Sequence, residues 1–274
     1  MSELRPQPLL ACWSLGKREI VRFFRQRNRI VGAIGTPILF WILFGAGFNS
    51  SFNLGDAGSP RFREYSFPGS VMLIVLFTAI FTTISIIEDR REGFLQSVLV
   101  APVRRWAMVL GKVWGGAVIA VVQAMLFLPL AFTFHEPAPI LNWVQLIVLI
   151  SVAAVALTSL GFMFAWNTDS TQGFHAVMNL VLMPMWLLSG GFFPAPLLDD
   201  RASFSEAAVH WAIRLNPLSY AVAGVRHLLF PGENYGTAWV PSLELSWVVT
   251  LLFAVATFAG ACAVSGRRTS GDLL

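Results

Sequence analysis

The residues whose types and spacing could do chemistry gather in one segment, 88–105, which reads EDRREGFLQSVLVAPVRR. Seven of its eighteen residues are charged, although most of the chain is apolar. Mixed charge beside a short apolar stripe favours ion pairing and a specific contact between proteins. The alternative is a solvated loop that only fixes topology, but such a loop needs arginines and not also Glu88, Asp89 and Glu92. We therefore predict that this segment is a docking element.

Motifs for catalysis or ligand binding do not occur in the sequence. The Gly-Lys pairs at 16–17 and 111–112 lack both the preceding Gly and the following Ser or Thr of a phosphate-binding loop. No nucleophile elbow occurs, and the histidines at 135, 175, 210 and 227 do not have metal-ligand spacing. We expect no catalytic residue, no metal, no cofactor and no nucleic acid partner.

The composition indicates an all-α integral membrane protein. Of the 274 residues, 56% are hydrophobic and 12% are charged, and the mean hydropathy is +0.67. Soluble domains carry roughly 25% charged residues, so this chain has too little polar material to cover a globule of its size. The apolar runs are continuous and do not alternate with a period of two, which favours helices over barrel strands.

Six segments reach the length of about 20 residues that a membrane-spanning helix needs. They form a single predicted transmembrane domain, 30–274. An amphipathic arm at 1–29 precedes this domain. The expected spans are 30–48, 67–87, 106–134, 141–166, 174–193 and 243–265.

The basic residues predict the orientation, because Lys and Arg concentrate on the cytoplasmic side of membrane proteins. Thirteen lie before the first span, between spans two and three, or after span six, against five in the other loops, with Lys112 set apart as buried near a span end. The thirteen are Arg5, Lys17, Arg18, Arg22, Arg25, Arg27, Arg29, Arg90, Arg91, Arg104, Arg105, Arg267 and Arg268. We predict a multi-pass plasma-membrane protein with both termini and segment 88–105 in the cytoplasm.

The arm at 9–29 is amphipathic when drawn as one helix. An arginine stripe at 18, 22, 25 and 29 lies opposite an apolar face of Leu9, Leu10, Trp13, Ile20, Val21 and Phe24. Such a helix is expected in the headgroup plane, with its arginines near anionic lipid phosphates. It serves either as an orientation anchor or as a lever that touches a cytoplasmic partner.

Segment 88–105 predicts a short amphipathic helix that joins spans two and three. Phe94, Leu95, Val98 and Leu99 share one face of this helix, and Pro102 should end it by about residue 101.

Two blocks of sequence resemble the permeases of type-2 ABC exporters, which include drug, polysaccharide and nodulation-factor exporters. The first block has Glu88, Gly93, Leu95 and Pro102, followed by Gly111-Lys112. The second is SGGFFP at 189–194 and NPLSY at 216–220, with Arg226 six residues after Tyr220. Phe94 and Gln96 depart from the commoner family text, which has Thr and an acidic residue there.

The resemblance implies an exporter subunit that uses a coupling helix to seat on a separate ATPase chain, where ATP and Mg are bound. It assigns contact with this ATPase to Glu88, Glu92, Gly93, Leu95 and Pro102, with Arg104 and Arg105 seating the helix at the lipid surface. A second permease copy is also an expected partner, because six spans enclose too little space for a large cargo. We expect a homodimer in preference to a heterodimer.

The segment between spans five and six is expected to form an outer gate. Ser203 and Glu206 have capping-box spacing, and 217–230 is too short to span the membrane and too apolar for a loop. This predicts re-entrant helices, which the resemblance supports. The gate residues are Asn216, Pro217, Tyr220 and Arg226.

No charged residue lies near the middle of a span, which disfavours an ion-coupled carrier. Uncharged polar groups occur instead, and Thr78, Thr82, Gln123 and Asn179 either join helices or line a mildly polar path. Such a lining suits an amphipathic or hydrophobic cargo: a drug, a lipid-linked molecule or a glycan-like one. The competing hypotheses are a carrier that needs no ATPase and a membrane scaffold that transports nothing.

Overall fold

The computed structural model describes residues 7–48, 61–133, 138–195, 203–233, 235 and 238–266. Every regular element in these ranges is a helix, which confirms the predicted all-α class. In chain order they are α1 (Pro8–Arg25), α2 (Arg27–Phe48), α3 (Phe62–Arg91), α4 (Phe94–Val100), α5 (Arg105–Phe127), the 3-10 helix η1 (Leu128–Thr133), α6 (Ile140–Trp166), α7 (Thr171–Leu187), α8 (Phe204–Leu215), α9 (Pro217–Leu229) and α10 (Leu243–Ser265). Arg5, His135, Arg267 and Arg268 lie outside the described residues.

Five helices of the described chain are long and apolar enough to cross a membrane: α2, α3, α5 with η1, α6 and α10. Helix α7 has 17 residues, the lower limit of the spanning range. The fifth span was expected to run to residue 193, but the helix ends at Leu187 because Gly190 turns the chain with a φ of 67°.

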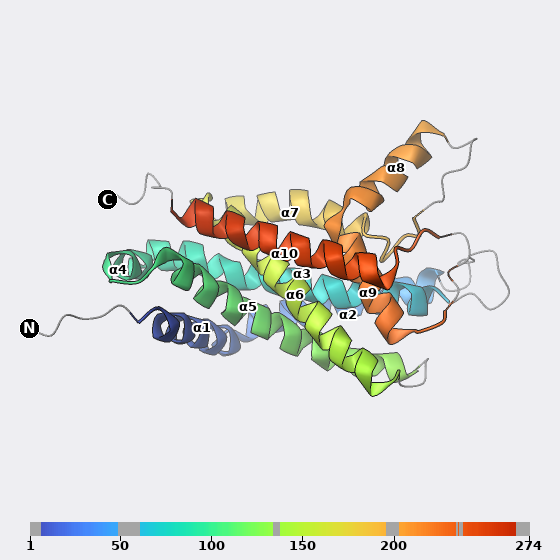
Figure 1. Ribbon diagram of the computed structural model, residues 1–274, viewed down its shortest axis with the longest axis horizontal. Coiled ribbons are helices and arrows are strands. Elements are labelled where there is room, and N and C mark those ends of the chain that lie inside the picture. Colours follow the sequence, from blue (N-terminus) through green and yellow to red (C-terminus); the bar gives the residue numbers. More distant parts are fainter. Residues whose placement is uncertain are drawn as a thin grey trace, which may run out of the picture.

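The long helices run side by side, with α4 at one end of the bundle and α8 at the other (Figure 1). We call these the α4 end and the α8 end. The beginning of α1 and the end of α10 lie at the α4 end, and α9 lies at the α8 end. Helix α3 is the centre of the bundle: it is almost wholly buried and packs against α2, α5, α6, α7 and α9.

Small residues bring the central helices close together. A Cβ added at Gly116 of α5 would lie 2.9 Å from the Thr82 hydroxyl of α3, and one at Gly161 of α6 would lie 2.8 Å from the Thr83 hydroxyl. Such contacts let apolar helices pack by shape where no hydrophobic effect drives them together.

Helix α1 packs along the first turns of α5. A Cβ added at Gly115 would lie 2.9 Å from the Gly16 carbonyl oxygen, and one at Gly111 would lie 2.8 Å from the Cys12 carbonyl oxygen. The expected single helix over 9–29 is interrupted at Gln26, where α1 ends and α2 follows. The arm is therefore part of the helical bundle.

Candidate functional site

A cluster of charged side chains ties four helices together at the α4 end. We call it the charge cluster. Its members are Arg18, Glu19 and Arg22 of α1, Arg29 of α2, Glu88 and Asp89 of α3, and Lys112 of α5.

Asp89 is the centre of the charge cluster, and its side chain is fully buried. Arg18 donates two hydrogen bonds to this carboxylate, from Nη2 to Oδ1 at 2.7 Å and from Nη1 to Oδ2 at 2.9 Å. Nη1 of Arg22 lies 2.6 Å from Oδ1. Lys112 donates to Oδ2 of Asp89 and, at 2.6 Å, to Glu19. A buried carboxylate is tolerated only when cations and hydrogen bonds replace its water in this way.

Arg18, Arg22 and Arg29 thus face protein carboxylates and not lipid phosphates, which corrects the expectation for these three residues. Nη2 of Arg22 lies 2.8 Å from Glu88, and Arg29 contacts the other oxygen of the same carboxylate. The physical reason is that α3 brings two carboxylates, Glu88 and Asp89, within reach of these arginines. Glu88, assigned by resemblance to the ATPase contact, holds the arm in place.

The arginines that follow in the sequence bind the end of α6. Arg90 donates to the carbonyl oxygens of Trp166, at 2.6 Å, and Thr168, at 3.3 Å. Arg91 donates to the Asp169 carbonyl at 3.3 Å. The last carbonyls of a helix lack partners within it, so cationic side chains stabilise them. The two acids of the EDRR sequence therefore hold α1 in place, and its two arginines hold the end of α6.

Gly93 starts α4 because it adopts a left-handed conformation, with a φ of 76°. No side chain or backbone atom lies within 4 Å of where its Cβ would be, so only the backbone angle favours glycine there. At the other end, Ala101 is extended, as expected for the residue before Pro102. The short helix predicted from the sequence is present, with a sharp turn on each side.

The apolar face of α4 points into the bundle. Leu95 is only 4% exposed, and Val98 and Leu99 pack partly buried against the core. The Arg18 guanidinium lies 3.7 Å above the Phe94 ring, which joins the arm to α4. Leu95, which the resemblance assigned to the ATPase contact, is thus packed with its apolar stripe against its own protein.

The opposite face of α4 is exposed, and the sequence reasoning missed its apolar member. Val100 is 86% exposed, and Gln96 and Ser97 are exposed beside it. The signal was available in the sequence, since the Gly93 turn starts the helix at Phe94 and places Gln96 and Val100 one turn apart. Glu92, Pro102 and Arg104 are exposed at the same end.

Arg105 has a contact inside the protein. Its Nη1 lies 2.8 Å from the carbonyl oxygen of Ser265, the last residue of α10. It therefore neutralises a helix C-terminus, as Arg90 does for α6.

At the α8 end, three predicted gate residues surround the junction of α8 and α9. Asn216 caps α9 by accepting from Leu218 N–H at 3.0 Å and donates at 2.8 Å to the Leu188 carbonyl, just beyond α7. Pro217 occupies the first turn of α9, where its missing N–H costs nothing. The Tyr220 hydroxyl donates to the Arg214 carbonyl of α8 at 2.8 Å.

The fourth gate residue, Arg226, is buried without an acidic partner in the described part of the chain. It donates to the Tyr65 carbonyl at 3.1 Å and to the Gly190 carbonyl at 3.0 Å. Its guanidinium also lies over the rings of Tyr65, at 4.2 Å, and Tyr235, at 5.1 Å. Burial raises the pKa of Tyr235, so this phenol stays neutral beside the arginine.

Three of the four expected path residues lie inside the packed bundle. The Thr78 hydroxyl donates to the Gln123 side-chain oxygen and, at 2.7 Å, to the Ile74 carbonyl, and Thr82 donates to the Thr78 carbonyl at 2.9 Å. All three side chains are buried between α3 and α5. Asn179 alone is exposed, on α7. Thr78 and Gln123 link α3 to α5, whereas the Thr82 hydroxyl bonds within α3.

Side chains that could ligate a metal ion do not converge anywhere in the described ranges. His227 lies 2.9 Å from the Pro241 carbonyl through Nε2, and Cys12 and Cys262 are both free thiols. The chemistry of these sites is therefore ion pairing and hydrogen bonding between helices.

Comparison with known proteins gives consistent matches over most of the chain. A family model described as ABC-2 type transporter matches residues 10–230. The inner membrane transport permease YadH of Escherichia coli is 26% identical over 220 residues, which are 80% of this chain and 82% of that protein. The probable doxorubicin resistance ABC transporter permease protein DrrC of Mycobacterium tuberculosis is 24% identical over 224 residues, 78% of this chain and 75% of its own.

Proposed function

The chain belongs to the ABC-2 type transporter family and is thus the membrane subunit of an ABC transporter, and from this premise we propose that it is the permease of an exporter driven by a separate ATPase. The ATPase binds ATP and Mg, and this chain binds neither. The transporter is a multi-pass protein of the bacterial inner membrane, as its relatives and apolar helices indicate. We place the α4 end and both termini in the cytoplasm, because the basic residues concentrate at that end.

The observation that carries the proposal is the exposed face of α4. Val100, an apolar residue 86% exposed at the tip of a short helix, stands between the charged residues Glu92 and Arg104. Protein–protein interfaces have an apolar core and a polar rim, and the exposed face of α4 has this composition. We assign contact with the ATPase to Glu92, Gly93, Gln96, Val100, Pro102 and Arg104.

The other residues of the predicted contact set hold α4 in position. Leu95 anchors the helix in the core, Glu88 fixes the arm, and Arg105 fixes the end of α10. A push on α4 therefore reaches α3 directly, because α4 packs against α3, and it reaches α1 and α6 through Asp89 and Arg90. The charge cluster and the Arg90 contacts make these helices move as one unit.

A homodimer provides the transport path. Helix α7 exposes Gln172, His175 and Asn179, spaced three to four residues apart and so on one side of the helix. Polar side chains on a membrane-crossing helix face a protein partner or a water-filled space and not lipid. We propose that this side of α7 faces the second copy and borders the path, with Asn179 as the path residue among those predicted.

The cargo we propose is amphipathic or hydrophobic: a drug-like, lipid-linked or glycan-like molecule. The described spans carry no charge near their middle, and the relative DrrC is named for doxorubicin resistance. At the α8 end, α8 and α9 form a re-entrant outer gate. Asn216 and Arg226 link this gate to α7 and α3, and Pro217 and Tyr220 set the angle between α8 and α9.

Affinity purification of the full-length permease with its co-expressed ATPase tests the proposal. Val100→Glu should leave the melting temperature unchanged, since Val100 makes little contact with its own protein, and should abolish retention of the ATPase and ATP-driven dye uptake into inside-out vesicles. The matched control is Val209→Glu, on an exposed position of α8 at the opposite end. Normal ATPase retention by Val100→Glu would refute the assigned contact, and uptake that needs no ATPase would refute the ATP-driven exporter.

A further inference from the structure

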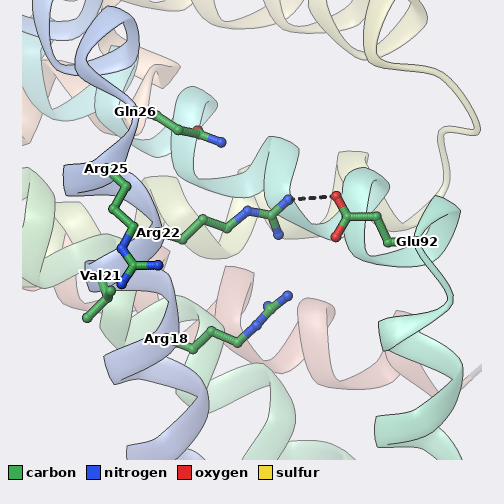
Figure 2. A pocket seen from close by; sticks show the side chains of 6 residues that line it. All are labelled: Arg18, Val21, Arg22, Arg25, Gln26 and Glu92. Atoms are coloured by element: carbon green, nitrogen blue, oxygen red, sulfur yellow. Dashed lines mark hydrogen bonds and ion pairs between the residues drawn. The ribbon is translucent and has the colours of Figure 1, made fainter.

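The elbow between α1 and α2 carries positive charge that the charge cluster does not use. The two helices are separated by one residue, Gln26, and two adjoining hollows lie on either side of it. The first, of about 480 Å³, is lined by Arg18, Val21, Arg22, Arg25, Gln26 and Glu92 (Figure 2). The second, of about 510 Å³, is lined by the consecutive residues 25–29.

The arginines around these hollows fall into two groups. Figure 2 shows Arg22 joined to Glu92, while Arg25 lies beside Val21 without such a link. Arg18, Arg22 and Arg29 bind α3 carboxylates, whereas Arg25 and Arg27 are exposed and make no ion pair in the described part of the chain. The one acid that lines either hollow is Glu92, which Arg22 already contacts. The elbow therefore has two uncompensated cations.

An apolar stripe leads along α1 to the same elbow. Leu10, Trp13, Val21 and Phe24 are all at least two-fifths exposed, and consecutive members are three or eight residues apart, which puts them on one side of the helix. Lys17 is exposed within this stripe. A ligand that matches the whole surface has an anionic head for Arg25 and Arg27 and an apolar tail for the stripe.

We propose that the α1–α2 elbow is a binding site for an anionic phospholipid, with the headgroup phosphate between Arg25 and Arg27 and an acyl chain along Val21 and Phe24. Arginine is suited to phosphate because its planar nitrogens bind two oxygens at once. The buried side-chain oxygen of Gln26 has no hydrogen-bond partner, so a headgroup with hydroxyl donors, such as that of phosphatidylglycerol, completes its bonding.

A membrane lipid fits this surface better than a partner's carboxylate or a free phosphate. Neither of these would cover Val21 and Phe24, which flank the elbow and would otherwise stay exposed. The elbow also directly precedes the spanning helix α2, at the level where headgroups lie. The inference stands on this surface alone and does not require that the ATPase contact or the cargo be as proposed.

The test is lipid binding by the purified full-length permease in neutral detergent. Phosphatidylglycerol and phosphatidylcholine are titrated separately, with retained lipid counted by native mass spectrometry and the melting temperature recorded in parallel. We expect phosphatidylglycerol to be retained and to raise the melting temperature, and phosphatidylcholine to do neither. Arg25→Gln with Arg27→Gln should weaken phosphatidylglycerol binding about thirtyfold, from about fivefold for each arginine near an anionic surface.

Three controls make the result decisive. Arg91→Gln removes an exposed arginine at the same end but away from the elbow, and it should leave phosphatidylglycerol retention unchanged. Inorganic phosphate and soluble glycerol phosphate should not raise the melting temperature, because they lack the acyl chain. Equal binding of phosphatidylcholine, an equal effect of free phosphate, or full binding by the double variant would each overturn the lipid site. Unchanged melting temperatures of the variants without lipid show that they fold.

Discussion

Arg22 and Asp89 are 67 residues apart in the sequence, yet Nη1 of the arginine lies 2.6 Å from Oδ1 of the aspartate. This contact fixes the arm to the end of the central helix, next to the turn that leads into α4. Because Arg18 and Lys112 bind the same carboxylate, three elements, α1, α3 and α5, depend on one buried side chain.

Asp89→Asn should therefore destabilise the permease strongly. Removing the charge leaves Lys112 buried beside two arginines with less compensation, and breaking a buried pair costs about 3–5 kcal/mol. Thermal unfolding in detergent measures the loss. Asp169→Asn, which removes a carboxylate that is 94% exposed at the same end, should change the melting temperature little. Equal stability of the two variants would show that the charge cluster does not hold the helices together.

The glycine contact between α1 and α5 should tolerate no side chain. Gly115→Ala places a Cβ 2.9 Å from the Gly16 carbonyl oxygen, so α1 must move away from α5. We expect faster tryptic cleavage at the arginines of α1 and a lower melting temperature. Gly47→Ala is the matched control, because nothing lies within 4 Å of the added methyl group in α2. Cleavage of the two variants at the same rate would contradict a close helix contact.

Substitutions at Gly93 should rank by how well each residue adopts a positive φ. Asn should be tolerated best, Ala should cost roughly 1–2 kcal/mol, and Pro should not fit, because its ring fixes φ near −65°. ATP-driven uptake should fall in the same order, since the turn sets the direction of α4. Uptake by Gly93→Pro equal to that of the native chain would show that the left-handed turn is dispensable.

The buried Arg226 should be needed for the packing of the α8 end. Arg226→Gln removes two hydrogen bonds from a buried site, those to the Tyr65 and Gly190 carbonyls. Tyr65→Phe removes one hydroxyl bond to Gly190, at 2.8 Å, and should cost about 1 kcal/mol. The melting temperature should fall more for Arg226→Gln than for Tyr65→Phe. Arg214→Gln, on the exposed surface of α8, is the control. If the melting temperature fell as much in Arg214→Gln as in Arg226→Gln, a special role for Arg226 would be refuted.

Asn179 and Thr78 should differ in what their substitution changes. Asn179→Leu should alter which dyes stimulate ATP hydrolysis while leaving the melting temperature unchanged, because the side chain is exposed and makes no contact that fixes a helix. Thr78→Val should lower the melting temperature and keep the dye preference, because its hydroxyl joins α3 to α5. The opposite pattern would place the path inside one protomer and not between two.

The sequence by itself determined the elements that depend on neighbouring residues. Apolar length predicted the spanning helices, Pro102 predicted the end of α4, and Ser203 with Glu206 predicted the start of α8. The structure shows that capping box, with the Ser203 N–H donating to the Glu206 carboxylate at 2.8 Å. Each of these signals lies within the segment that it predicts, so no knowledge of the rest of the fold is needed.

Only the tertiary structure decided which partner each charge meets and which face of each helix is buried. The sequence indicated that Arg18 and Arg22 lie on one stripe, but α1 had to dock on α5 before that stripe met Asp89. Leu95 and Val100 are both apolar residues of α4, and the rotation of that helix against α3 buries one and exposes the other. The physical reason is that helix rotation and register are set by contacts between segments distant in the chain, which local periodicity does not record.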